Sequence, residues 1–112
     1  MCLNTREIGN QSEVQAIEFL EKNGYLIIDR NFYTKFGEID IIAKKDNILH
    51  FIEVKSGKNF QSIYNITPTK MKRIIKSINV YLKKYKLNNP YQIDAITIDN
   101  GKLEFIKNIS FF

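Results

Sequence analysis

The sequence predicts one α/β domain, in which a mixed β-sheet is flanked by helices in the order α-β-β-β-α-β-β. A chain of 112 residues with 44% hydrophobic residues can bury one core and is too short for two ordinary domains. Apolar residues recur at helical spacing in two places, and five short stretches are rich in β-branched and aromatic residues. Because no repeat or linker interrupts the chain, we expect residues 1–112 to form a single domain.

The first helix is expected from about Thr5 to Asn23. Asn4 and Glu7 stand three residues apart, as in a capping box, and the helical spacing ends at Gly24. The apolar residues that carry this spacing are Ile8, Ala16, Ile17 and Leu20.

A three-stranded meander is expected next. Its strands and turns are Tyr25–Tyr33, Phe36-Gly37, Glu38–Ala43, Asp46-Asn47 and Ile48–Val54. The polar stretch Gly57–Ile66 then predicts a loop of about ten residues, which is long enough to carry binding residues.

The second helix should begin at Pro68, with Thr67 as its N-cap, and end near Lys86. A helix between the third and fourth strands implies a crossover, so the sheet should be mixed and covered on at least one face. The apolar stripe of this helix comprises Met71, Ile74, Ile75, Ile78, Leu82 and Tyr85. The last two strands, Tyr91–Ile98 and Leu103–Ile106, are joined by the strong hairpin signal Asn100-Gly101.

Composition excludes several kinds of protein and site. The single cysteine, Cys2, cannot form an intramolecular disulfide, and with one histidine, His50, a multi-histidine zinc site or a Ser-His relay is hard to build. The longest apolar run, Tyr25–Ile28, falls far short of the roughly 20 residues that span a membrane. No secretory signal is recognisable, so we expect a cytoplasmic protein in which carboxylates bind any metal.

The net charge of +5 is unevenly distributed. Between Val54 and Ile93 there are nine Lys or Arg residues and no acid, whereas the remainder holds eight basic and twelve acidic residues. Such a block attracts phosphate backbones through counterion release, although basic helix faces are also often simply solvated. We select Lys70 and Arg73, one turn apart, as the nucleic-acid-binding residues.

The second predicted strand carries acidic residues on one face. Glu38 and Asp40 are two residues apart, so they should project together, with Ile39 and Ile41 on the opposite face. Glu38 could support a metal site by contacting the residues that bind the metal, or it could form an ion pair with Lys44.

Asp40, Glu53 and Lys55 are candidates for chemistry because hairpin pairing would bring them close. Carboxylates on a buried sheet face are costly unless they are paired or bind a cation, and Mg²⁺ prefers oxygen ligands. With Lys55 placed to position or deprotonate a water, these residues have the parts for metal-dependent phosphodiester hydrolysis. The alternative is a cross-strand network of ion pairs.

The spacing of Asp40 and Glu53-Val54-Lys55 resembles the PD-(D/E)XK signature of restriction-endonuclease-like nucleases. The resemblance extends over nearly the whole chain, through Gly9–Leu20, Arg30-Asn31, Gly37–Ala43 and Phe51–Lys55. Together these segments are similar to the YraN-like family of uncharacterised bacterial proteins, which are predicted endonucleases similar in fold to archaeal Holliday-junction resolvases.

The resemblance implies a restriction-endonuclease-like fold and a role for each matched residue. Asp40 and Glu53 would bind Mg²⁺ or Mn²⁺, and the Val54 carbonyl would be a further ligand. Lys55 would be the catalytic lysine. Glu13 matches the extra acidic residue that such resolvases place near the metal, whereas on its own it is typical of a solvated helix residue.

Two residues are open to structural explanations. Asp94 could support the site from behind its ligands or cap a sheet edge, and we favour a structural role. His50 alternates out of phase with Phe51 and Glu53, which favours a structural residue over a general base.

These observations favour a metal-dependent endonuclease that acts on DNA. Analogy with resolvases adds branched DNA as the substrate and a homodimer as the assembly. The alternative is a non-catalytic nucleic-acid-binding module on the same fold, which would bind in a salt-sensitive way without metal dependence. A protein-interaction domain with incidental charge is the third hypothesis.

Overall fold

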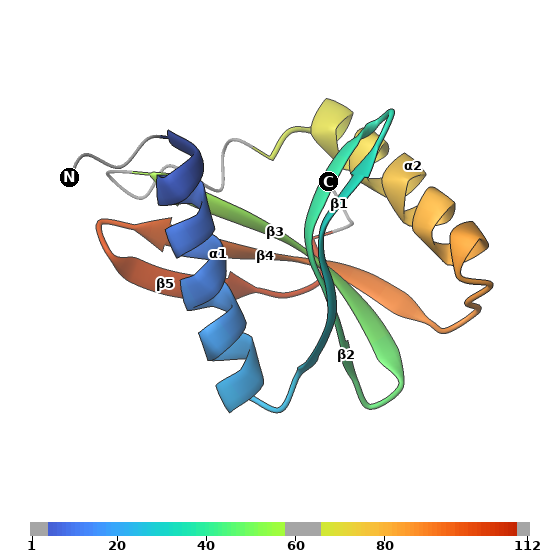
Figure 1. The fold of residues 1–112 in the computed structure, drawn as a ribbon, viewed down its shortest axis with the longest axis horizontal. Helices are drawn as coiled ribbons and strands as arrows, with labels where there is room; N and C mark the ends of the chain where they lie inside the picture. The colour runs from blue at the N-terminus through green and yellow to red at the C-terminus, as the bar shows by residue number, and fades with distance from the viewer. Residues whose placement is uncertain (1–4, 58–65, 110–112) are drawn as a thin grey trace.

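The computed structural model describes residues 5–57 and 66–109, apart from the side chains of residues 5–10. Asn4 of the predicted capping box, the side chain of Glu7, and most of the predicted loop Gly57–Ile66 lie outside the described residues. Two helices and a twisted central sheet make up the described part of the chain (Figure 1).

The elements follow the predicted order and lie within a few residues of the predicted bounds. They are α1 (Thr5–Lys22), β1 (Leu26–Thr34), β2 (Gly37–Lys45), β3 (Ile48–Gly57), α2 (Pro68–Lys84), β4 (Tyr91–Asp99) and β5 (Lys102–Ile106). The strands lie in the sheet in chain order, β1-β2-β3-β4-β5. β3 and β4 are parallel and the other neighbours are antiparallel, which confirms the mixed sheet with its crossover helix. In the described part of the chain, neither helix has the length and apolar character to span a membrane.

The hairpin turns fall where the sequence predicts them. Between β2 and β3, Asp46 and Asn47 have φ values of +52° and +64°, and between β4 and β5, Asn100 and Gly101 have +52° and +80°. Two consecutive residues with positive φ make the two-residue turn whose twist matches that of the flanking strands. Asn, Asp and Gly are the residues that adopt this conformation most readily, which is why the prediction from residue type succeeds.

α2 begins at its predicted cap, and its buried face follows the predicted stripe except at its end, with Ile75 and Leu82 packed at the margin of the core. The hydroxyl oxygen of Thr67 accepts a hydrogen bond from the Lys70 amide at 3.2 Å. Tyr85, which we assigned to the apolar stripe, is 46% exposed, and Tyr81 is buried in its place. The helix ends at Lys84, so Tyr85 is the C-cap and leaves the regular turn that would direct it to the sheet. The buried residues of α2 are Met71, Ile74, Ser77, Ile78 and Tyr81.

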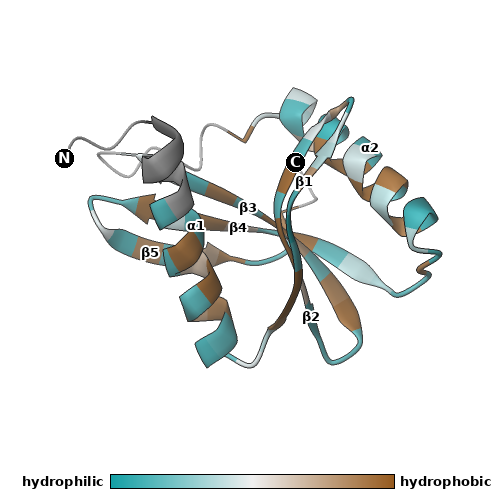
Figure 2. Cartoon of the chain, in the orientation of Figure 1, coloured by the Kyte–Doolittle hydropathy of each residue, from teal (hydrophilic) through white to brown (hydrophobic). Residues whose placement is uncertain are grey.

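Two hydrophobic cores fill the two faces of the sheet. Phe51 and Ile93 belong to the core under α2, and Ile52 and Ile96 belong to the core under α1. Successive residues of a strand point to opposite faces, so neighbours in β3 enter different cores. Figure 2 shows hydrophobic residues concentrated on the strands and on parts of both helices. Both faces of the sheet are therefore covered.

β2 departs from regular alternation near Asp40. Ile39 packs in the core under α2 and Ile41 in the core under α1, so the prediction that they share one face is wrong. The backbone is irregular here, because β2 separates from β3 and Asn31, between the β1–β2 pairs Arg30–Ile41 and Phe32–Ile39, has a φ of +54°. Pairing between β2 and β3 ends at Ile41 and Ile52, whereas pairing between β1 and β2 continues to Gly37.

Candidate functional site

The candidate site lies where β2 separates from β3. The Asp40 side chain bridges the two strands beyond their last main-chain pair, because its Oδ2 accepts a hydrogen bond from the Val54 amide at 2.8 Å. This bond fixes the carboxylate beside Glu53, and both side chains line one cavity. Val54 thus contacts the site through its amide, and the role of its carbonyl stays a prediction.

Three carboxylates gather at this point. One oxygen from each of Glu13, Glu38 and Asp40 lies within 4.8 Å of the other two. Glu13 comes from α1, where its side chain is only 13% exposed, and its Oε2 lies 3.4 Å from Nη2 of Arg30 on β1. Glu13 is therefore not a freely solvated helix residue. Glu38 belongs to the same cluster, and no ion pair joins it to Lys44 among the residues that the structure describes.

Glu53 is the most unusual member of the site. The residue is 8% exposed, and its Oε1 is buried without a hydrogen-bond partner in the described structure. Its Oε2 lies 3.8 Å from Nζ of Lys55, which is longer than a hydrogen bond. A buried carboxylate oxygen that lacks a partner is strongly unfavourable unless something outside the protein's own side chains satisfies it.

The pKa values of these carboxyl groups reflect burial and mutual repulsion. Burial, followed by the charge of Asp40, raises the pKa of Glu53 to about 8, although Lys55 opposes the shift. Burial also raises the pKa of Asp40 to about 6, against the hydrogen bond from Val54. The pKa of Glu38 is raised as well, by burial and then by Glu13. A bound cation would lower these pKa values, because it favours the ionised carboxylates.

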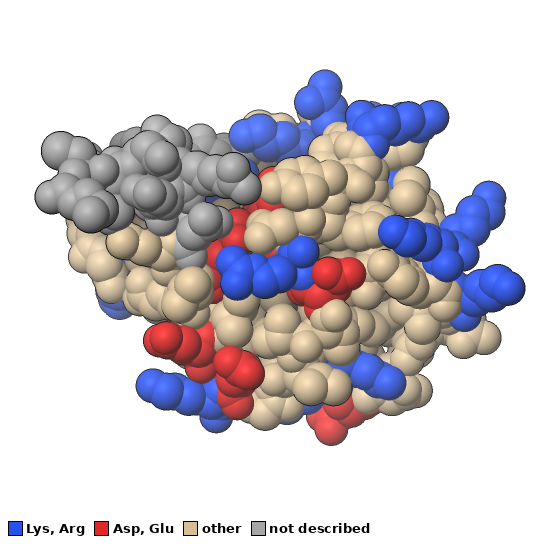
Figure 3. Space-filling view, viewed as in Figure 1, with Lys and Arg blue, Asp and Glu red and all other residues tan. Residues whose placement is uncertain are grey.

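A cavity of about 250 Å³ joins the carboxylates to basic side chains. Lys70 and Arg73, from the start of α2, line the same cavity as Asp40, Glu53 and Lys55. The structure therefore brings both predicted nucleic-acid-binding residues to the predicted metal ligands. Figure 3 shows acidic side chains reaching the surface near the middle of the view, with basic side chains over the side that α2 occupies.

Asp94 and His50 lie away from this cluster. Asp94 is fully buried, and its Oδ2 lies 2.7 Å from Nδ1 of His50. Its Oδ1 accepts hydrogen bonds from the Gln92 side chain and the Asn108 amide, each at 2.7 Å. β4 is an interior strand, so Asp94 does not cap a sheet edge, and it lies on the sheet face of α1, opposite Glu53. These contacts support a structural role for both residues.

Sequence reasoning did not select Arg30 or Phe36 as site residues. Arg30 lies in one of the segments that carry the family resemblance, but its ion pair with Glu13 requires α1 to pack beside β1. Phe36 was assigned to a turn, and the structure places it on the wall of the carboxylate cavity. Neither contact has a local signal in the sequence.

The fold and the site define a class of mixed α/β protein. In this class, carboxylates cluster where two neighbouring strands separate, and basic residues line the adjoining cavity. Within that class, the chain belongs to the uncharacterised protein family UPF0102, whose model matches residues 12–98. This result confirms the YraN-like resemblance found in the sequence.

Relatives match the chain over nearly its full length. This chain is 55% identical over 106 residues to a UPF0102 protein of Wolinella succinogenes, and the match covers 95% of this chain and 98% of the relative. A UPF0102 protein of Helicobacter hepaticus is 51% identical over 108 residues, or 96% of this chain and 98% of its own. One from Campylobacter fetus subsp. fetus is 50% identical over 112 residues, or 99% of this chain and 100% of its own.

Proposed function

We propose that this protein is a metal-dependent endonuclease that hydrolyses phosphodiester bonds of DNA. The observation that carries the proposal is the buried Oε1 of Glu53, which has no hydrogen-bond partner among the residues that the structure describes. The cavity that Glu53 lines also contains further carboxylates and basic side chains. Such an oxygen lowers stability in the free protein, and it is well suited to bind a cation.

The side chains fit a hard divalent cation such as Mg²⁺ or Mn²⁺. The three clustered carboxylates offer oxygens within 4.8 Å of one another, and Glu53 offers its buried Oε1. We propose Asp40 and Glu53 as ligands, and the Val54 carbonyl is the further ligand that the family resemblance implies. Glu13 and Glu38 would add negative charge beside them. When bound, the cation would polarise a phosphoryl oxygen and stabilise the leaving oxygen.

Three basic side chains line the cavity and would contact the substrate. Lys55 lines the cavity beside Glu53, where its ammonium group can hold the attacking water or a phosphate oxygen. Lys70 and Arg73 would bind flanking phosphates, and the planar guanidinium of Arg73 can make two parallel hydrogen bonds. In hydrolysis, the water oxygen bonds to phosphorus and loses a proton, while the bond to the leaving oxygen breaks and that oxygen gains a proton.

The finer parts of the proposal concern the substrate, the oligomeric state and the location of the protein in the cell. Nine basic residues without an acid between Val54 and Ile93 favour a nucleic acid over a small phosphate ester. Branched DNA, a homodimeric assembly and a cytoplasmic location remain the expectations that accompany the resemblance and the sequence.

The test is cleavage of a labelled panel of duplex, single-stranded, flap and four-way-junction DNA with Mg²⁺ or Mn²⁺. Wild-type protein is compared with Asp40→Asn and Glu53→Gln, each of which replaces one carboxyl group by an amide of nearly the same shape. Glu104→Gln is the matched control, because this carboxylate is exposed on β5. We expect metal-dependent cutting by the wild type and the control, and loss of cutting in both site variants.

Two results would contradict the proposal. Equal cleavage by Asp40→Asn and the wild type would remove the carboxylates from the mechanism. A folded wild type that binds the panel in a salt-sensitive way but never cuts would instead be a non-catalytic nucleic-acid-binding module.

A further inference from the structure

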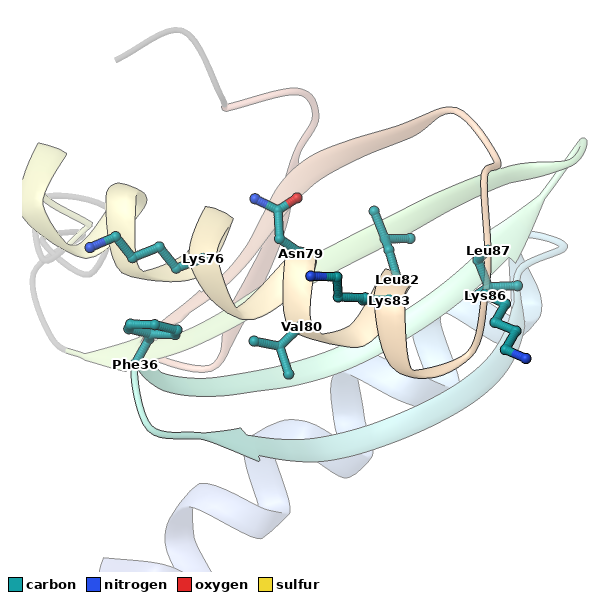
Figure 4. A pocket seen from close by; sticks show the side chains of 8 residues that line it. All are labelled: Phe36, Lys76, Asn79, Val80, Leu82, Lys83, Lys86 and Leu87. Atoms are coloured by element: carbon teal, nitrogen blue, oxygen red, sulfur yellow. The ribbon is translucent and has the colours of Figure 1, made fainter.

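A groove of about 830 Å³ runs along α2 and meets the candidate site at Phe36. Phe36 lines both this groove and the carboxylate cavity, so the two spaces share a wall. Figure 4 shows Phe36 and Lys76 at one end of the groove and Lys86 and Leu87 at the other. We call this space the α2 groove, and its walls include Phe36, Lys76, Val80, Lys83, Lys86 and Leu87.

Phe36 is held against α2 by the tip of the β1–β2 hairpin. The hydroxyl oxygens of Thr34 and Ser77 lie 2.8 Å apart and join the end of β1 to a buried position of α2. The same Thr34 oxygen accepts a hydrogen bond from the Phe36 amide at 3.0 Å. The Phe36 ring lies near two cations, with Nζ of Lys35 and Nζ of Lys76 at 5.2 and 5.3 Å from its centroid. The groove therefore has a fixed aromatic end flanked by positive charge.

Exposed side chains of α2 continue from the carboxylate cavity into the groove. Arg73 lines the carboxylate cavity, and Lys76, Val80 and Lys83 follow it at steps of three, four and three residues. Residues at this spacing lie on one face of a helix. At a rise of about 1.5 Å per residue, the path from Arg73 to Lys83 is about 15 Å long, which is enough for a short run of nucleotides.

The chemistry of the groove matches an unpaired nucleic-acid strand. Its charged lining residues are Lys76, Lys83 and Lys86, and the lining also includes the apolar side chains of Val80 and Leu87. Single strands expose both phosphates and flat base faces, and proteins bind them with basic grooves that contain aromatic side chains. Duplex DNA offers mainly its phosphates to such a groove. An acidic peptide would satisfy the charge but would leave the continuity with the carboxylate cavity unexplained.

We propose that the α2 groove binds an unpaired strand that leads away from the cleavage site, with phosphates on its lysines and a base against Phe36. This inference rests on the proposed function for the identity of the polymer. It specifies the substrate further, because DNA with a single-stranded tail should bind more tightly than blunt duplex.

The experiment measures binding of fluorescein-labelled duplex, with and without a single-stranded tail, by fluorescence anisotropy in EDTA. Lys83→Gln is compared with Lys84→Gln, its neighbour in the chain, which undergoes the same loss of charge but does not line the groove. A Lys76→Gln/Lys83→Gln double variant and Phe36→Leu complete the set. Circular dichroism checks the fold, and the variants of exposed lysines carry the test if Phe36→Leu does not fold.

We expect the wild type to prefer tailed DNA and Lys84→Gln to keep that preference. Lys83→Gln should lower the slope of log affinity against log salt by about 0.7, and the double variant by about 1.4. Phe36→Leu should weaken binding of tailed DNA by about fivefold or more, because an aromatic stacking platform is lost.

Three outcomes would overturn the inference. The first two are equal wild-type affinity for tailed and blunt duplex, and equal losses of DNA affinity in Lys83→Gln and Lys84→Gln. The third is that groove variants bind DNA as the wild type does but no longer bind a polyglutamate peptide. The last of these would assign the groove to an acidic protein partner. A protein that prefers tails through the groove yet never cleaves DNA would contradict the proposed nuclease activity and leave this inference standing.

Discussion

Replacing Glu53 by Gln should stabilise the metal-free protein while abolishing its cleavage of DNA. The wild-type carboxyl group is buried, and one of its oxygens has no hydrogen-bond partner in the described part of the chain. Its pKa is raised to about 8 from 4.5. Its folded state therefore holds a proton that the unfolded state releases above about pH 4.5. Because the unfolded state binds fewer protons in this range, the stability of the wild type falls as pH rises from about 5 to about 8. Glutamine has nearly the same shape and does not ionise, so the stability of the variant should not fall with pH for this reason.

The magnitude follows from the same pKa. At about 1.4 kcal/mol per pH unit, the interval from 4.5 to about 8 sets an upper limit of about 5 kcal/mol. Rearrangement around the charge and the nearby ammonium group of Lys55 reduce the effect, so we expect about 2 kcal/mol at pH 8. For a chain of this length, that corresponds to a rise in melting temperature of roughly 8 °C. At pH 5 the two proteins should differ little.

Thermal unfolding followed by circular dichroism in EDTA, at pH 5 and pH 8, measures this difference. Glu104→Gln serves as the control, because this carboxylate is exposed and its removal should have the same small effect at both pH values. Adding Mg²⁺ should raise the melting temperature of the wild type and not that of Glu53→Gln. An equal loss of stability in Glu53→Gln at both pH values would refute the reasoning, since it would show that Glu53 is satisfied within the protein.

Three further predictions concern other parts of the structure. Asp94→Asn should destabilise the fold by about 1 to 3 kcal/mol in chemical denaturation, because it weakens a buried hydrogen-bond network with His50. Metal-dependent cleavage should remain measurable, and its complete loss in a folded variant would contradict a structural role for Asp94. Thr67→Ala should cost about 1 kcal/mol through loss of the cap on α2, and an unchanged urea midpoint would show that the cap is dispensable. Combined Lys70→Gln and Arg73→Gln substitutions should weaken DNA binding and lower the salt slope by about 1 to 2, and an unchanged slope would remove both residues from the phosphate contacts.

The sequence by itself determined the order and type of the elements, because their signals are local. Asp46-Asn47, a pair of residues that readily adopt positive φ, forms the turn between two strands, and Thr67 caps a helix through an amide three residues away. The charged residues of the candidate site were also visible, since Asp40 and Glu53 interrupt apolar strands. These features depend on a few neighbouring residues, so composition and spacing are sufficient to find them.

Only the tertiary structure decided which of those residues meet. The irregular backbone around Asp40, where β2 separates from β3, turns Ile39 to the face opposite Ile41, and the end of α2 leaves Tyr85 exposed. Glu13 reaches the carboxylates only because α1 packs beside β1, and Phe36 joins two cavities only because the β1–β2 hairpin is fastened to α2. These contacts join segments that are far apart in the chain, and their geometry depends on how whole elements pack, which no local periodicity encodes.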